Sequence, residues 1–183
     1  LVISIIINTL YVLGRRSIRI KGKNYSIQVQ YGDLFKMRAC KIVIPFDECF
    51  TTSVGAAPSD INPDSICGQY LKEYPIQDIQ SLIDNVQLKP AKGKSKYQNK
   101  ERYDSGKLVP NGNYLLMAFA KLDKDGLGRM TRDEFLACLS ACGRKLTNTM
   151  DRRMYAYLYW APESPVWMIH LLHSQELLEI IIG

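Results

Sequence analysis

The chain contains few of the residues from which metal centres and disulfide frameworks are built. Its 183 residues include two histidines, His170 and His173, close together near the end of the sequence. The five cysteines, an odd number without a CxxC pair, are Cys40, Cys49, Cys67, Cys138 and Cys142. Such spacing argues against a zinc site and against a secreted disulfide scaffold. We therefore expect free thiols, a reducing compartment and no metal.

A long hydrophobic run is also missing. A transmembrane helix needs about 20 apolar residues, whereas residues 1–13 form a shorter apolar run that is followed at once by Arg15 and Arg16. This order fits the last part of a membrane span with its arginines in the cytoplasm, so we predict that residues 1–14 are the end of a transmembrane helix. A buried first strand or helix of the domain is the alternative. A cleaved signal peptide does not fit, because its charges would precede the apolar stretch.

The overall composition is that of one globular domain with a positive charge. Hydrophobic residues make up 46% and charged residues 23% of the chain, which argues against wholesale disorder. The net charge of +6 fits a phosphate-bearing ligand, nucleic acid or an anionic membrane, and solubility alone explains it equally well. Residues 88–100 are basic and poor in apolar side chains. Because a charge run is usually a solvated surface, we predict a loop or an edge strand here and no nucleic-acid partner, with a nucleic-acid patch as the alternative.

Strand patterns occur in four places. Residues 17–20 and 26–31 alternate polar and apolar side chains on either side of a glycine-containing turn, which is typical of a β-hairpin or of two sequential strands. Residues 41–46 and 114–120 are nearly continuous apolar runs, as in buried strands. For residues 114–120 a helix is the alternative, because periodicity alone does not distinguish the two.

Three helices are predicted between and after these strands. The first begins near residues 62–64, where a proline suits the first helical turn, and the second begins near Pro75. The third follows Thr131, which can form a capping box with Glu134, and continues to about residue 144. Strands alternating with helices indicate a layered α/β domain.

Residues 123–134 are close to an EF-hand calcium loop. The carboxylates at its first, third and twelfth positions are Asp123, Asp125 and Glu134. Leu127 stands at the fifth position, where a side-chain oxygen is needed, and no second loop of this kind exists in the sequence. We therefore favour a strand-to-helix connection in which Thr131 caps the helix, and keep calcium binding as the alternative.

Several segments in this order resemble the macro domain. Residues 32–35, Gly-Asp-Leu-Phe, follow a strand and are similar to the GDIF/GDIT signature of that family. Residues 44–52, IPFDECFTT, resemble the family segment P-x-N-E-x-F-D-T, and residues 103–109 and 113–122 resemble its later strands. The likeness covers residues 15–146, and the nearest resemblance is to the membrane-anchored macro proteins of the Thoeris anti-phage defence family.

The resemblance implies a three-layer α/β/α fold around a mixed sheet, with a cleft for an ADP-ribose-like nucleotide at the carboxyl end of the sheet. The ligand-binding residues that it implies are Asp33, Leu34, Phe35, Phe46, Asp47, Phe50 and Thr51. The carboxylate of Asp33 would accept hydrogen bonds from the adenine amino group, and its alternative role is that of a turn carboxylate. Asp47 replaces the asparagine that faces the distal ribose in macro domains, so it can accept hydrogen bonds but cannot donate them.

The resemblance also implies a function. A signalling nucleotide made by a TIR-domain partner, histidine-linked ADP-ribose in the family, would bind the macro-like domain and promote homo-oligomer assembly, and the transmembrane part would damage the host membrane. The implied location is the bacterial inner membrane, with the domain in the cytoplasm. We predict a sensor that is not an enzyme and has no cofactor. A macro-fold ADP-ribosyl hydrolase is the alternative.

The glycine-rich loop that holds the diphosphate in macro domains has no counterpart in this sequence. Residues 147–183 are instead an aberrant or divergent segment, in which residues 147–173 show no clean periodicity. Regrouping the possible codons permits the missing glycine loop in another frame, so we hypothesise that residues 147–174 are read out of frame. Natural divergence is the alternative, and the coding DNA distinguishes the two. Without this loop, we predict weak or no nucleotide binding by the chain.

Overall fold

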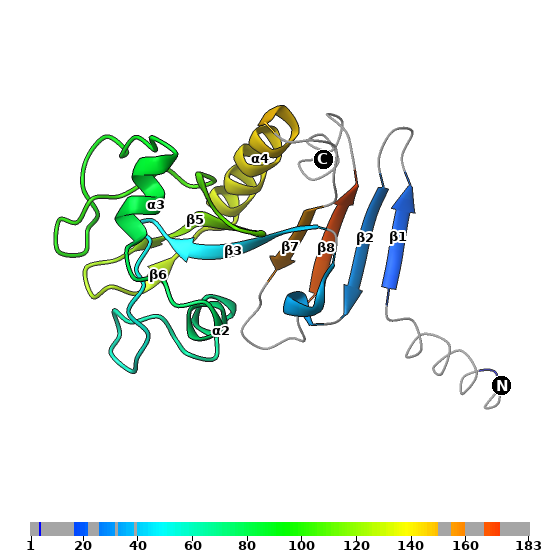
Figure 1. The fold of residues 1–183 in the computed structure, drawn as a ribbon, viewed down its shortest axis with the longest axis horizontal. Helices are drawn as coiled ribbons and strands as arrows, with labels where there is room; N and C mark the ends of the chain where they lie inside the picture. Colours follow the sequence, from blue (N-terminus) through cyan, green and yellow to red (C-terminus); the bar gives the residue numbers. More distant parts are fainter. Residues whose placement is uncertain are drawn as a thin grey trace.

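The structure is a computed structural model, and it describes residue 4 and residues 17–21, 26–31, 33–38, 40–149, 155–159 and 167–172. Strands and helices alternate along the chain (Figure 1). In order, the elements are β1 (Ser17–Lys21), β2 (Ser26–Tyr31), the 3-10 helix η1 (Leu34–Lys36), β3 (Lys41–Asp47), α2 (Ile66–Glu73), α3 (Ile79–Asn85), β4 (Leu108–Asn111), β5 (Tyr114–Leu122), β6 (Gly128–Arg129), α4 (Arg132–Thr149), β7 (Tyr155–Tyr159) and β8 (Trp167–Leu172).

The described strands form one mixed sheet in the order β1-β2-β8-β7-β3-β5-β4, with β6 paired to β5. Strand β3 runs parallel to both of its neighbours, β5 and β7, and the other pairs are antiparallel. Strands β1 and β2 form the antiparallel hairpin predicted from their alternation. The predicted mixed α/β fold is thus confirmed.

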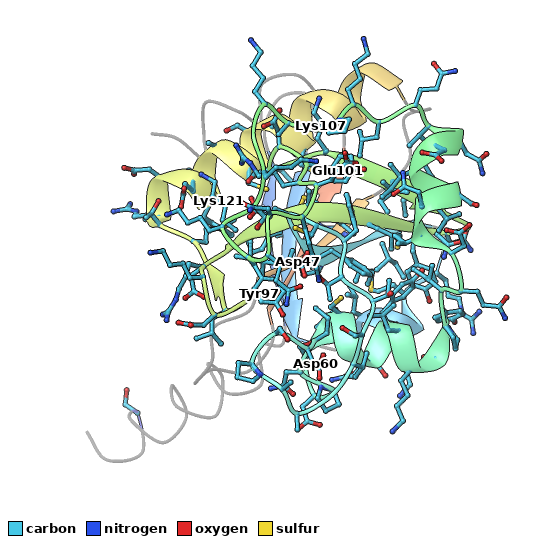
Figure 2. All side chains as sticks on the ribbon, turned by 90° about the vertical axis from the view of Figure 1, so that its left-hand side faces the viewer. Asp47, Asp60, Tyr97, Glu101, Lys107 and Lys121 are labelled. Atoms are coloured by element: carbon cyan, nitrogen blue, oxygen red, sulfur yellow. The ribbon has the colours of Figure 1, made fainter. Side chains whose placement is uncertain are left out.

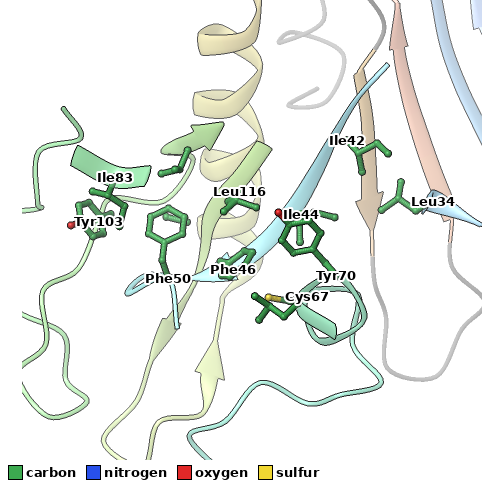
Figure 3. Close-up of a cluster of buried hydrophobic side chains, with 13 residues drawn as sticks. Leu34, Ile42, Ile44, Phe46, Phe50, Cys67, Tyr70, Ile83, Tyr103 and Leu116 are labelled. Carbon is green, nitrogen blue, oxygen red and sulfur yellow. The ribbon is translucent and has the colours of Figure 1, made fainter. Parts of the chain in front are cut away.

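Alternate residues of β3 and β5 supply two hydrophobic clusters, one on each face of the sheet. Ile44, Phe46 and Leu116 belong to the larger cluster, in which side chains of α2 and α3 also take part (Figure 3). Val43 and Leu115 face the other way and pack in a second cluster with Met117 and with two cysteines of α4. Helices therefore cover both faces of this part of the sheet, with α2 and α4 on opposite sides of it (Figure 1).

Helices α2 and α3 begin later than the prolines predicted. The Ser65 hydroxyl accepts a hydrogen bond from the Gly68 amide at 3.0 Å, and this cap starts α2 at Ile66. Asp78 caps α3 in the same way, accepting from the Ser81 amide at 3.1 Å. A serine or aspartate side chain accepts a hydrogen bond from a free amide of the first turn. A proline is compatible with the first turn but supplies no such acceptor.

Helix α4 begins as predicted, at the capping box. The Glu134 amide donates to the Thr131 hydroxyl at 3.2 Å, and the Thr131 amide donates to the Glu134 carboxylate at 2.9 Å. Two free amides are thereby satisfied reciprocally. The helix continues to Thr149, about one turn beyond its predicted end.

Residues near the end of the chain form two strands, β7 and β8. The sequence did not predict them, because it shows no clean periodicity there. Strand β8 pairs with β2 on one side and with β7 on the other, and β7 pairs in turn with the start of β3. The N-terminal hairpin is therefore connected to β3 through β8 and β7. The hypothesis that residues 147–174 are read out of frame stays a prediction for the coding DNA.

The predicted membrane segment, residues 1–14, lies outside the described residues except for residue 4. Within the part of the chain that the structure describes, none of the helices has the length and apolarity needed to cross a membrane.

Gly106 provides a test of how α4 is packed on the sheet. Its φ is +83°, and a Cβ placed there would lie 2.8 Å from the Ala141 side chain and 2.9 Å from the Cys138 carbonyl oxygen of α4. We expect Gly106→Ala to lower the free energy of unfolding by about 1–2 kcal/mol for the backbone conformation and by about 1–3 kcal/mol more for the clash.

Gly93→Ala is the matched control, because Gly93 has a similar φ of +88° and nothing within 4 Å of the added Cβ. Urea unfolding of both variants measures the two contributions. Equal losses of stability in the two variants would show that α4 does not pack closely on the turn at Gly106.

Candidate functional site

The carboxyl ends of the parallel strands β3 and β5 lie at one end of the molecule, where three loops meet. A Cβ placed on Gly126, in the β5–β6 turn, would lie 2.8 Å from the Ser59 side chain and 3.0 Å from the Tyr97 ring. Figure 2 looks onto this end of the molecule, with Asp47 and Tyr97 near the centre of the view. Open α/β sheets bind ligands outside the carboxyl ends of their strands, so this end is the candidate site.

The side chain of Asp47, the last residue of β3, stabilises the turn that follows the strand. One carboxylate oxygen accepts hydrogen bonds from the Cys49 amide at 2.8 Å and from the Thr51 amide at 3.2 Å. The side chain is buried, and this burial raises the pKa of Asp47, while the Thr51 side chain and the two amides oppose the rise. Asp47 and Thr51, two of the predicted ligand-binding residues, therefore lie in contact. The Asp47 carboxylate is hydrogen-bonded to backbone amides of its own turn.

Phe50 lies inside the turn that Asp47 closes. Its φ of +52° is unusual for a residue other than glycine, and its ring is 1% exposed. The ring centroid is 6.0 Å from that of Phe46 and 5.5 Å from that of Tyr103. Phe46 and Phe50 therefore pack in the hydrophobic core, and their contact with a ligand stays a prediction.

Asp33 occupies the turn position given above as its alternative role. Its carboxylate accepts from the Phe35 amide at 3.0 Å, which caps η1, and pairs with Lys36 at 3.2 Å. Leu34 is 2% exposed and belongs to the core. The Phe35 ring packs 6.5 Å from that of Tyr114. Asp33 itself is exposed, so its carboxylate remains accessible from solvent.

The two groups of predicted ligand-binding residues lie at opposite ends of β3. Phe35 contacts Tyr114, which pairs with Ile42 at the start of the strand, whereas Asp47 pairs with Ala120. Six residues of β5 separate those two positions, which corresponds to ~20 Å along the strand. Figure 3 likewise shows Leu34 well apart from Phe50, with Phe46 and Ile44 between them. The structure thus does not join the Asp33 group and the Asp47 group in one place.

Glu48 is a residue of this site that the sequence analysis missed. Its carboxylate is buried, accepts hydrogen bonds from the Ser95 hydroxyl at 2.6 Å and from the Leu122 amide at 3.2 Å, and lies 3.5 Å from the Arg102 guanidinium. Its carbonyl oxygen accepts from the Tyr103 amide at 2.7 Å. One side chain therefore ties the end of β3 to the basic loop and to the end of β5. The family-like motif contains this glutamate, but its partners are distant in sequence.

The calcium-like stretch folds as a β-turn followed by a helix cap. One Asp123 carboxylate oxygen accepts from the amides of Asp125 and Leu127 at 3.0 and 2.9 Å, and the other pairs with Arg129 at 3.0 Å. Strands β5 and β6 flank this turn, where an EF-hand would begin with a helix. The predicted strand-to-helix connection is therefore what the structure contains.

Glu134, the twelfth residue of that stretch, caps α4 and pairs with Lys121 at 2.5 Å. The Lys121 ammonium and the Thr131 amide and hydroxyl lower the pKa of Glu134 to about 2. Among the residues that the structure describes, no group of three or more histidine, cysteine or acidic side chains could hold a metal ion.

The buried charge of Asp47 yields a pH-dependent prediction. A raised folded-state pKa means that this group stabilises the fold most below the ordinary aspartate range, and that the contribution is lost as the pH rises through the folded-state pKa. Asp47→Asn keeps the oxygen that accepts from the Cys49 and Thr51 amides and removes the charge. We expect its melting temperature to exceed that of the wild type at pH 7, with the difference vanishing near pH 3.5.

Asp47→Ala is the control, since it removes both the charge and the acceptor. Leaving two amides of the turn without their partner is expected to cost about 1–3 kcal/mol. Thermal unfolding between pH 3.5 and pH 8 measures all three proteins. If Asp47→Asn is as unstable as Asp47→Ala at pH 7, the carboxylate charge itself is needed and this account of the turn is wrong.

Glu134 has the opposite pH dependence, because its folded-state pKa is lowered. Its contribution is present above pH 4.5 and is lost as the pH falls toward 2. We expect Glu134→Gln to flatten the decline in melting temperature over this range, since it cannot lose an ionised partner of Lys121. Glu73→Gln, on the exposed surface of α2, is the control and should leave the decline unchanged. An unchanged decline in Glu134→Gln would contradict the assigned interaction.

Comparisons with known proteins place these features in a family. Residues 27–158 match the family described as Thoeris protein ThsA, macro domain, so the match extends past the predicted limit at residue 146 and into β7. The Thoeris protein ThsA of Bacillus amyloliquefaciens (strain Y2) is 28% identical over 149 residues, which cover 74% of this chain and 48% of the relative. The chain thus spans about half the length of that curated relative. From the extent of the family match, the chain belongs to the macro domain family of the Thoeris protein ThsA.

Proposed function

We propose that this chain is the ligand-binding domain of an anti-phage defence protein and that it takes an ADP-ribose-like nucleotide at the carboxyl ends of β3 and β5. The observation that carries the proposal is the ordered turn of residues 47–51, which stands at that end in a chain of the ThsA macro domain family. Three loops converge beside it. The positive charge of the chain favours an anionic ligand.

Binding without catalysis fits the state of Asp47. A general base needs a carboxylate oxygen directed at its substrate or at a water molecule. Here one oxygen accepts hydrogen bonds from the amides of Cys49 and Thr51, and the Thr51 side chain also forms a hydrogen bond with the carboxylate. These bonds favour a structural carboxylate over a catalytic one, so we place a sensor ahead of an ADP-ribosyl hydrolase.

The wider role follows from the resemblance of the sequence. In this proposal the ligand is a signalling nucleotide, histidine-linked ADP-ribose, made by a TIR-domain partner. Its binding promotes assembly of several copies of the chain. Residues 1–14 would anchor the domain at the bacterial inner membrane, facing the cytoplasm, and the assembled membrane part would damage the host membrane.

Titration calorimetry of the full chain with ADP-ribose and with histidine-linked ADP-ribose tests the proposal. We expect saturable one-to-one binding that is weaker than micromolar, because the glycine loop of the family is missing from the sequence. Adenosine, which lacks the diphosphate, is the control ligand and should bind more weakly still. No saturation up to ~1 mM, an affinity equivalent to about 4 kcal/mol, would overturn the proposed function. Micromolar or tighter binding would instead overturn the predicted loss of the phosphate loop.

A further inference from the structure

Nearly all of the excess positive charge of the chain lies in one loop. Residues 89–102 contain six cations and one carboxylate, a net charge of +5, against +6 for the whole chain. The cations are Lys89, Lys92, Lys94, Lys96, Lys100 and Arg102. All five lysines are exposed. We call residues 89–102 the lysine loop.

The lysine loop is held in a fixed shape by internal and external bonds. Ser95 is 2% exposed, its hydroxyl donates to Glu48 at 2.6 Å, and its amide donates to the Lys100 carbonyl oxygen at 2.9 Å. The Arg102 guanidinium donates to the Lys92 carbonyl oxygen at 3.1 Å and faces Glu48 on its other side. Because the backbone is ordered in advance, binding a ligand costs little further backbone entropy, and the cost that remains is that of ordering the lysine side chains.

The loop also lies next to the candidate site. Tyr97 lies beside Gly126, in the turn that follows β5. The Lys100 ammonium is 4.9 Å from the centre of the Tyr97 ring. Cys49, two residues after Asp47, lies close enough to the loop for its pKa to respond to Ser95 and Lys100. Burial raises the pKa of the Cys49 thiol to about 11, and Ser95 and Lys100 oppose that rise.

The nearby carboxylates do not neutralise this charge. Asp47 is surrounded by amides of its own turn, and Glu48 is buried against Arg102 and Ser95. Within the described residues, Lys94 is the lysine of the loop that forms an ion pair, with Glu101 at 3.2 Å. Lys96 and Lys100, on either side of Tyr97, have no ion-pair partner among those residues.

We propose that the lysine loop binds the phosphate groups of the ligand, with the ammonium groups of Lys96 and Lys100 supplying the positive charge. This inference rests on the proposed function, since it names the part of the site that takes the diphosphate. An ammonium group is a point charge that pairs with phosphate without a fixed geometry. The loop thus provides by charge what a glycine loop provides by backbone amides.

The test compares Lys96→Ala/Lys100→Ala with a matched double variant, Lys21→Ala/Lys72→Ala. Lys21 and Lys72 are exposed residues of β1 and α2, so the control loses the same charge away from the lysine loop (Figure 1). Calorimetric titrations use inorganic pyrophosphate and ADP-ribose at low salt. We expect roughly tenfold weaker binding of both ligands by Lys96→Ala/Lys100→Ala, the sum of two exposed ion pairs, and less than about a twofold change in the control.

Salt provides a second readout, since exposed charge pairs are screened. The affinity of the wild type for pyrophosphate should fall as the salt concentration rises, and Lys96→Ala/Lys100→Ala should show a smaller fall. Equal affinities of both double variants, or no pyrophosphate binding by the wild type, would overturn the inference. If ADP-ribose still binds in that case, the proposed function stands without it. If pyrophosphate binds at the lysine loop but ADP-ribose shows no saturation up to ~1 mM, the loop binds phosphate as proposed and the nucleotide function fails.

Discussion

The buried carboxylate of Glu48 is the interaction on which the candidate site depends. It bonds the Ser95 hydroxyl and the Leu122 amide and faces Arg102, so that β3, the lysine loop and the end of β5 share one charged centre. A charge taken out of water is tolerated only when hydrogen bonds and an opposite charge surround it. Arg102 is partly exposed, whereas the Ser95 hydroxyl and the Leu122 amide would lose a buried acceptor if Glu48 were removed. A buried donor left without its partner typically costs about 1–3 kcal/mol. The shape of the loop beside the site is therefore coupled to the side chain of Glu48, the residue directly after β3.

Two adjacent acidic residues at the end of β3, Asp47 and Glu48, bind different partners. Asp47 closes the turn that follows it, which keeps Phe50 in its left-handed conformation and its ring in the core. Glu48 faces the neighbouring loops instead. Glu48 lies directly after the end of β3, in the turn, so the two neighbouring carboxylates can face different partners. Burial is the main cause of the raised pKa of Asp47, and the charge of Glu48 adds to it. Neither acid is left as a free anion beside the phosphate subsite we propose.

The sequence predicted those parts of the fold whose signals are local. The alternation of residues 26–31, the apolar run of residues 41–46 and the capping box at Thr131 each correspond to an observed element. The role of Glu48 could not be predicted, because its partners Ser95 and Leu122 lie 47 and 74 residues away. The separation of Asp33 from Asp47 was missed for a related reason: motif order does not reveal which end of a strand a preceding turn packs against. Strands β7 and β8 show no clean alternation in the sequence. Their places in the sheet come from pairing with the distant strands β3 and β2, respectively, and a local sequence pattern does not reveal such pairing.

The strand order has a consequence for how the chain folds during synthesis. The first hairpin made, β1–β2, pairs with the rest of the described sheet through β8, which is the last described strand to be made. Contacts between segments so far apart in sequence close slowly and late. The central strands β3, β4 and β5 and the helices beside them are complete long before β8 exists. During translation the edge of β2 that later pairs with β8 therefore stays unpaired, and an unpaired edge is the part of a nascent sheet most open to association with another chain.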